Sequence, residues 1–113
     1  MADCIFCNIA AGKIKANVVY DDQKVMAFRD VSPKAPVHIL FIPKKHVERV
    51  SAVDEKDLTL FADLHRAVQI VATKENLSNG FRLVTNNGKG VGQTVDHLHY
   101  HMLAGRDMSW PPG

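Results

Sequence analysis

Eleven residues near the C-terminus, Gln93–Leu103, read Gln-Thr-Val-Asp-His-Leu-His-Tyr-His-Met-Leu and hold half of the protein's six histidines. His97, His99 and His101 alternate with apolar or aromatic residues, which is the period of a β-strand. We therefore predict a strand here, with all three imidazoles on one face and neighbouring rings about 6.6 Å apart. Imidazoles titrate near neutral pH, so a row of them on a rigid element indicates a site of chemistry.

The glycine-rich segment Asn86–Gly92 leads directly into this stretch. Its glycines allow several backbone N–H groups to lie close together, which is one way a protein holds an anion. Such loops are common in hairpins, so a purely structural role remains open. The polar side chains of Gln93 and Thr94 follow the loop, so an anion cradle, hydrogen-bond donors and imidazoles succeed one another along the chain.

The rest of the chain predicts a small α+β protein. A short helix over 4–11 is followed by a hairpin of strands 17–20 and 24–28, and the strongly apolar strand 37–42 is interrupted only by His38. Further strands are expected at 81–85 and at the histidines, giving about five in a sheet covered on one face. The main helix has Asp54 as its expected N-cap, and its expected inner face is made by Leu58, Phe61, Ala62, His65, Val68 and Ala72.

Length and composition favour one domain spanning 1–113. The chain is 46% hydrophobic and 23% charged, and its formal net charge of +2 is too small to indicate nucleic-acid binding by electrostatics. No apolar run approaches the roughly 18 residues that a transmembrane helix needs, so no membrane association is expected. The N-terminus lacks the basic and apolar regions of a secretory signal. We therefore expect a cytoplasmic protein in which the two cysteines form no structural disulfide.

The three histidines have more than one chemical interpretation. An incidental polar face is one interpretation, but three histidines in five residues are a large departure from chance. Three along one strand diverge too far to bind one metal ion together, although one or two of them could contribute ligands. A histidine also acts as a nucleophile when its neutral ring presents a bare nitrogen. His99 is the best placed for that role, because it is flanked by imidazoles on both sides.

The pair Cys4-x-x-Cys7 is a weak signal by itself. It is compatible with packing, with a redox pair, or with half of a zinc site. A structural zinc ion takes four thiolate or imidazole ligands in a tetrahedral arrangement. Two further ligands would have to come from the histidines of the chain.

Three stretches resemble the histidine triad family of nucleotide-binding proteins. The segment 92–103 is similar to the family signature His-φ-His-φ-His-φ-φ, where φ is apolar, with Tyr100 a mild departure. The segment 30–46 resembles the family as well. The ending 105–113, Gly-Arg-Asp-Met-Ser-Trp-Pro-Pro-Gly, is similar to the branch of purine nucleoside phosphoramidases.

This resemblance implies an antiparallel sheet of about five strands, one long and one short helix, and a homodimer whose sheets join edge to edge. It implies hydrolysis of purine nucleoside phosphoramidates through a nucleotidyl-histidine at His99, with no cofactor needed for catalysis. His101 would help to protonate the leaving group. Gln93 and Thr94 would contact the phosphate and the leaving group, and the family usually has serine at the position of Thr94. The rivals are a nucleotide-binding regulator, a dinucleoside polyphosphate hydrolase and a zinc-dependent hydrolase.

The resemblance also implies the remaining site residues. Asp30 would hold the ribose, and the end Trp110–Gly113 would reach the partner's active site. The nucleotide-binding set is Ile5, Phe6, Phe28, Asp30, Val31, His38, Asn86, Gly92, Gln93, Thr94, His99 and His101. In several branches of the family a structural zinc ion is bound at the positions of Cys4, Cys7, His46 and His97.

Overall fold

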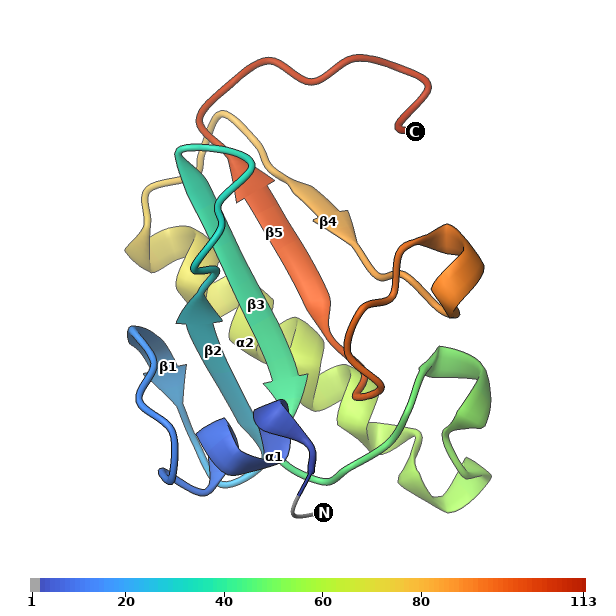
Figure 1. Cartoon of the computed structure of the whole chain (residues 1–113). Coiled ribbons are helices and arrows are strands. Elements are labelled where there is room, and N and C mark those ends of the chain that lie inside the picture. The colour runs from blue at the N-terminus through green and yellow to red at the C-terminus, as the bar shows by residue number, and fades with distance from the viewer. Residues whose placement is uncertain (1–2) are drawn as a thin grey trace.

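One antiparallel sheet of five strands organises the computed structural model, which describes residues 3–113 (Figure 1). The strand order is β1-β2-β3-β5-β4. The helices are α1 (Ile5–Ala10) and α2 (Thr59–Lys74), and the strands are β1 (Val18–Asp21), β2 (Val25–Arg29), β3 (Val37–Pro43), β4 (Arg82–Val84) and β5 (Tyr100–Ala104). The α+β class and the antiparallel sheet are therefore as predicted. Met1 and Ala2, on which the expectation about a secretory signal partly rests, lie outside the described residues.

Strands β2 and β3 are apolar at almost every position because each face of the sheet is covered. Val25 and Ala27 of β2 pack with α2, whereas Met26 and Phe28, which point the other way, pack with α1. Residues of β3 divide between the two cores in the same manner. Alternation in a strand sends successive side chains to opposite faces, so such a run requires two cores. The expectation that only one face is covered was wrong.

Helix α2 buries a different stripe from the one predicted. The residues of α2 that are buried are Leu60, Leu64, Ala67, Val68 and Val71. Leu58 precedes the helix and is 50% exposed, and Ala62 and His65 are exposed as well. The sequence carries two overlapping stripes with three- and four-residue spacing, and periodicity alone does not choose between them. Asp54 does act as a cap, but it caps the preceding 3₁₀ turn Glu55–Asp57, by accepting a bond from the N–H of Lys56.

Only the last of the three histidines lies in a strand. β5 begins at Tyr100, which pairs with Phe41, so that His97 and His99 lie in an irregular segment before it. The backbone there has partners outside the ladder: the N–H of Leu98 donates to the oxygen of Val47 (2.7 Å), and the hydroxyl of Thr85 donates to the oxygen of His99 (3.0 Å). The prediction of one continuous histidine strand was therefore wrong.

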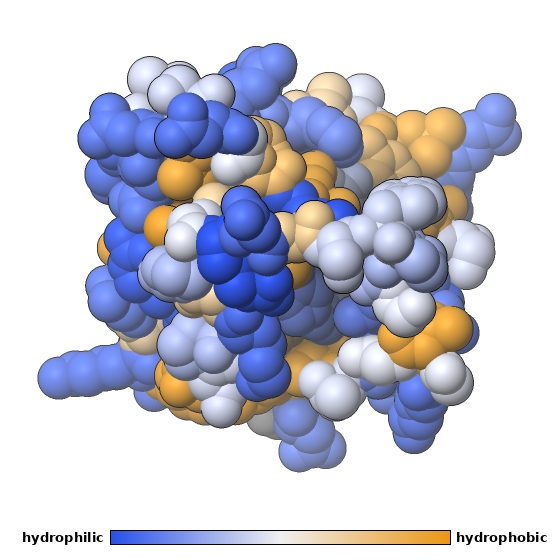
Figure 2. All heavy atoms as spheres, turned by 90° about the horizontal axis from the view of Figure 1, so that it is seen from above, coloured by the Kyte–Doolittle hydropathy of each residue, from blue (hydrophilic) through white to orange (hydrophobic). Residues whose placement is uncertain are grey.

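The sequence contains no long apolar run, and the helices and surface of the structure are consistent with that. Within residues 3–113 no helix has both the length and the apolar character needed to cross a membrane. On the face seen in Figure 2, hydrophilic residues predominate and hydrophobic ones form small separate areas. Both cysteines are free thiols.

Candidate functional site

A cleft of about 350 Å³ opens on the α1 side of the sheet, next to the last two histidines. Eight of the expected nucleotide-binding residues line it, namely Ile5, Phe6, Phe28, Asp30, Val31, Thr94, His99 and His101. Sequence reasoning missed the other lining residues, which are Ile9, Ile14, Lys15, Ala16, Arg29, Leu40 and Val95. Most of these are apolar residues that periodicity alone assigns to a core, and only their place in the fold brings them to a cleft.

The other four expected residues do not line the cleft. His38 and Gln93 are buried, at 5% and 3% exposure, and contact the lining from within. The side chain of Asn86 lies over Gly92, whose φ of +102° favours glycine.

His99 presents one bare nitrogen. A carbonyl oxygen only accepts, so Nδ1 of His99 must donate to the backbone oxygen of His97, 2.7 Å away. In the neutral ring, Nε2 then carries the free lone pair. Burial lowers the pKa of His99 and is the largest influence on it, so the ring is neutral at pH 7. The ring of Phe6 packs edge-on against it, with centroids 5.0 Å apart.

His38 and His101 form a hydrogen-bonded pair that the sequence did not reveal. The backbone N–H of Lys34 donates to Nδ1 of His38 (3.0 Å), which leaves the His38 proton on Nε2. That Nε2–H faces Nδ1 of His101 at 2.9 Å, with Asp30 Oδ2 at 3.4 Å. His101 accepts at Nδ1 and therefore carries its own proton on Nε2. The expectation placed His38 in the wall of a purine pocket, whereas its ring contacts the third histidine.

Burial also sets the charge of this pair. Burial, together with the neighbouring His99 and His38 rings, lowers the pKa of His101 to about 4, against the opposing effect of Asp30. Burial likewise lowers the pKa of His38, against the opposing effect of Asp30. Both rings are therefore neutral donors and acceptors at pH 7, and an anion bound near His101 would favour its protonated form.

The amide of Gln93 has all its partners inside the protein. Its Oε1 accepts from the N–H of Gly88 (2.8 Å), and its Nε2 donates to the backbone oxygens of Glu48 (2.6 Å) and Val95 (3.0 Å). Direct contact with a phosphate, as expected from the resemblance, would require some of these bonds to open. As it stands, the side chain fixes the glycine-rich loop beside the cleft.

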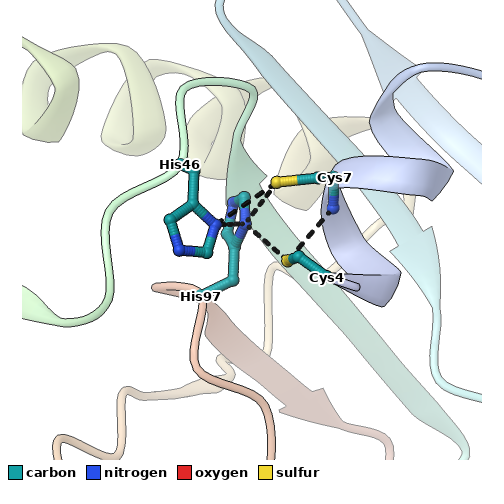
Figure 3. A group of neighbouring side chains, drawn as sticks. All are labelled: Cys4, Cys7, His46 and His97. Carbon is teal, nitrogen blue, oxygen red and sulfur yellow. Dashed lines mark hydrogen bonds between the residues drawn. The ribbon is translucent and has the colours of Figure 1, made fainter. Parts of the chain in front are cut away.

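The two cysteines, His46 and His97 converge on one point, as Figure 3 shows. Their ligand atoms all lie within 4.8 Å of one another. Nε2 of His97 donates to the backbone oxygen of Pro43 (2.8 Å), so its bare Nδ1 faces the cluster. Burial is the main cause of a His97 pKa of about 4, which keeps this ring neutral and able to bind a metal.

The spacing of these four atoms suits a tetrahedral ion. Zinc bonds of about 2.0–2.3 Å imply distances between neighbouring ligand atoms of about 3.3–3.8 Å. Nδ1 of His97 lies 3.4 Å from Cys4 Sγ, 3.6 Å from Cys7 Sγ and 3.2 Å from Nδ1 of His46. Cys7 Sγ lies 3.3 Å from His46 Nδ1. The donor set and its dimensions therefore fit a structural zinc site.

Comparison with known proteins places the chain in a family. The family model described as the HIT domain matches residues 11–108. An uncharacterised HIT-like protein of Synechocystis is 49% identical over 98% of this chain and 97% of its own length. The crystal structure of a HIT family hydrolase from Legionella pneumophila has a TM-score of 0.94 and 46% identity, covering 98% of this chain and 100% of the other.

A more distant solved structure extends the comparison. It is a histidine triad nucleotide-binding protein from Candida albicans, with a TM-score of 0.83 and 28% identity over 96% of this chain and 83% of the other. The family match spans most of the sequence, and the fold and the histidine geometry agree with it. The chain belongs to the HIT, or histidine triad, family.

Proposed function

We propose that this protein is a purine nucleoside phosphoramidase, which hydrolyses the bond between the α-phosphorus of a purine nucleotide and an amine. One observation carries the proposal: His99 is held by the His97 carbonyl with its unprotonated Nε2 available beside a cleft. Nucleophilic catalysis requires a bare imidazole nitrogen of this kind. The names of the hydrolase and nucleotide-binding relatives support the same class of chemistry.

The reaction has two steps. Nε2 of His99 attacks the α-phosphorus and forms an N–P bond, while the bond from phosphorus to the leaving nitrogen breaks. That nitrogen takes a proton from Nε2 of His101, whose pKa the bound phosphate raises. Water then attacks the phosphorus and forms a P–O bond while the bond from phosphorus to Nε2 of His99 breaks. A proton of the water passes to His101, and the nucleoside monophosphate leaves. The hydroxyl of Thr94, which lines the cleft, donates to the leaving group or a phosphoryl oxygen.

The hydrogen bonds of His38 would fix the orientation of the neutral His101 ring before substrate binds. The chain from Lys34 through His38 fixes the proton of His101 on Nε2. A fixed tautomer removes the cost of reorienting the ring during the reaction. Gln93 would hold the loop of residues 86–92 through its bond to the N–H of Gly88.

The cleft matches a nucleoside in size and polarity. The apolar residues Ile5, Phe6 and Phe28 would pack against the base, and the Asp30 carboxylate would accept hydrogen bonds from the ribose hydroxyls. Ser32 already donates its N–H to Oδ1 of Asp30 (2.8 Å), so the carboxylate is held in place. An open slot lined mainly by apolar groups, with a few polar atoms at one end, is typical of small-molecule sites.

Zinc would be structural in this proposal. Cys4, Cys7, His46 and His97 would take all four positions of a tetrahedral site, which leaves none for substrate. Metal analysis of protein purified without chelator should find about one equivalent of zinc; a content well below that would refute the site.

We propose further that the chain is one domain and forms a homodimer. Edge strand β4 would pair with its copy in a partner, and the exposed Trp110 (82%) with the prolines after it would approach the partner's cleft. Sedimentation equilibrium checks the dimer.

Mass spectrometry tests the central step. Acid-quenched protein mixed with adenosine 5′-phosphoramidate should carry an adenylyl group on His99. Steady-state rates with the phosphoramidate and with diadenosine polyphosphates separate the rivals. Faster turnover of the polyphosphates would favour the dinucleoside hydrolase, and near-uncatalysed rates with both would favour a binding protein.

A further inference from the structure

We infer that Cys4 and Cys7 are positioning residues for the nucleotide cleft: a metal ion bound at their cluster fixes α1 against the nucleophile, and loss of the metal weakens nucleotide binding. This inference rests on the proposed function. It assigns to the cluster a role in ligand affinity, beyond holding the fold together.

Helix α1 belongs to both sites at once. Cys4 caps it and Cys7 lies within it, and both thiols point into the metal cluster (Figure 3). Ile5 and Phe6, between them in sequence, line the cleft. The ring of Phe6 lies 5.9 Å from that of His97 and 5.0 Å from that of His99. A displacement of α1 therefore moves a wall of the cleft.

The helix is too short to hold its own position. It has six residues, and isolated helices below about 12–15 residues are marginal in water. Phe6 and Ile9 anchor it to the sheet through the smaller of the two cores. The thiols provide the other attachment, so removing the metal should loosen α1 without unfolding the protein.

The cluster also reaches the nucleophile through the backbone. Nδ1 of His97 faces the thiols of the cluster, and the backbone oxygen of the same residue accepts a hydrogen bond from Nδ1 of His99. His46 precedes Val47, whose oxygen accepts the N–H of Leu98 (2.7 Å). The metal would thus join three segments: α1, the turn after β3, and residues 97–99. The last of these segments contains the nucleophile His99.

Oxidation of the two cysteines is one way in which the cluster could lose its metal. The thiol sulfurs lie within 4.8 Å of each other. A peroxide can take two electrons from the two metal-bound thiolates: the S–S bond forms, the O–O bond breaks, and the two peroxide oxygens take up two protons from solvent and leave as two molecules of water. A disulfide lacks the thiolates that bind zinc, so the metal is released.

The experiment measures AMP affinity by calorimetry, with and without zinc. Removing zinc from the wild-type protein should raise the Kd for AMP by about tenfold, a coupling within the usual range. Treatment with hydrogen peroxide should raise it similarly and release one zinc ion, and reduction with added zinc should restore it. Hydrogen exchange should increase in residues 4–10 and not in the central strands β2 and β3.

Two variants separate the metal from thiol packing. His46→Asn removes a ligand that is neither on α1 nor in the cleft, and should weaken AMP binding as much as Cys7→Ser does. A loss confined to Cys7→Ser would overturn the role of the metal. The double variant Cys4→Ser, Cys7→Ser should show no further response to peroxide.

Thermodynamic reciprocity provides a test that needs no variant. If zinc tightens AMP binding, saturating AMP must tighten zinc binding by the same factor, which competition with a chelating dye measures. Equal AMP affinity with and without zinc would overturn this inference and leave the proposed function standing. Failure of zinc-loaded protein to bind AMP would instead refute the proposed function.

Discussion

The backbone oxygen of His97 accepts a 2.7 Å hydrogen bond from Nδ1 of His99. The two rings consequently turn in different directions: His97 presents Nδ1 to the thiols, and His99 presents Nε2 on the side of the cleft. A regular strand would have placed the rings on one face. The irregular backbone before β5 therefore lets two histidines only two residues apart serve separate sites.

Replacement of His99 by Asn should abolish turnover and preserve nucleotide binding. Asn keeps a polar side chain of similar reach but has no nucleophilic nitrogen. We expect kcat for adenosine 5′-phosphoramidate to fall by a factor of at least about 10³, while the Kd for AMP changes little. Rapid-quench kinetics and calorimetry provide the two numbers. A residual rate within tenfold of wild type would show that another group attacks the phosphorus.

Sequence reasoning succeeded where a local pattern has one structural solution. The apolar run Val37–Ile42 favoured a strand, and it forms most of β3 at the centre of the sheet. The pairing of Cys4 and Cys7 with two distant histidines followed from the family resemblance, and the fold brings those four together.

The failures have a common physical cause, which is that tertiary hydrogen bonds and packing override local periodicity. The alternation around His97 predicted a strand. In the structure the N–H of Leu98 bonds to Val47 and the backbone oxygen of His99 bonds to Thr85, so these groups do not pair with a neighbouring strand. Likewise, the contact between His38 and His101 depends on the register of β3 against β5, which sets Leu40 opposite His101. Residues on the same face of adjacent strands, one pair apart, remain within reach of each other, and no local pattern specifies that register.

The His38–His101 hydrogen bond should contribute to catalysis more than to binding. His38→Phe removes the donor to His101 and leaves the N–H of Lys34 without its acceptor. We expect kcat to fall by roughly 10–100-fold, as is usual for the loss of support to a general acid, with the Kd for AMP raised less. His38→Gln offers both a donor and an acceptor and should recover part of the rate. Equal activity of the two variants would argue against a fixed tautomer.

Thr94 should influence the leaving group more than the nucleotide. Its hydroxyl lines the cleft, but its methyl group restricts χ1. Thr94→Ser removes that restriction and keeps the hydroxyl, so the ratio of kcat/KM between a small amine and a bulky amine should change. AMP affinity should stay within about twofold of wild type, because the nucleoside contacts are retained. An unchanged ratio, measured with two adenosine phosphoramidates, would place the hydroxyl away from the reacting bond.

The buried histidines should make the fold sensitive to mild acid. The pKa of His101 is about 4 in the folded protein, because burial disfavours its charged form, against about 6.5 in the unfolded chain. Between these values the unfolded chain binds a proton here that the folded protein does not, so the free energy of unfolding falls as the pH is lowered from about 6.5 to 4.

His101→Gln isolates this contribution, because the variant does not titrate at that position. We expect wild type to lose more stability than the variant between pH 7.5 and pH 5, by an amount on the order of 1 kcal/mol after allowance for solvent screening of a partly exposed ring. Denaturant unfolding at the two pH values gives the difference, and any acid effect on the thiols is common to both proteins and cancels. Identical pH dependence of the two proteins would mean that His101 titrates at its ordinary pKa. Saturating AMP should shrink the difference, because the phosphate stabilises the protonated ring and so returns the folded-state pKa toward the unfolded value.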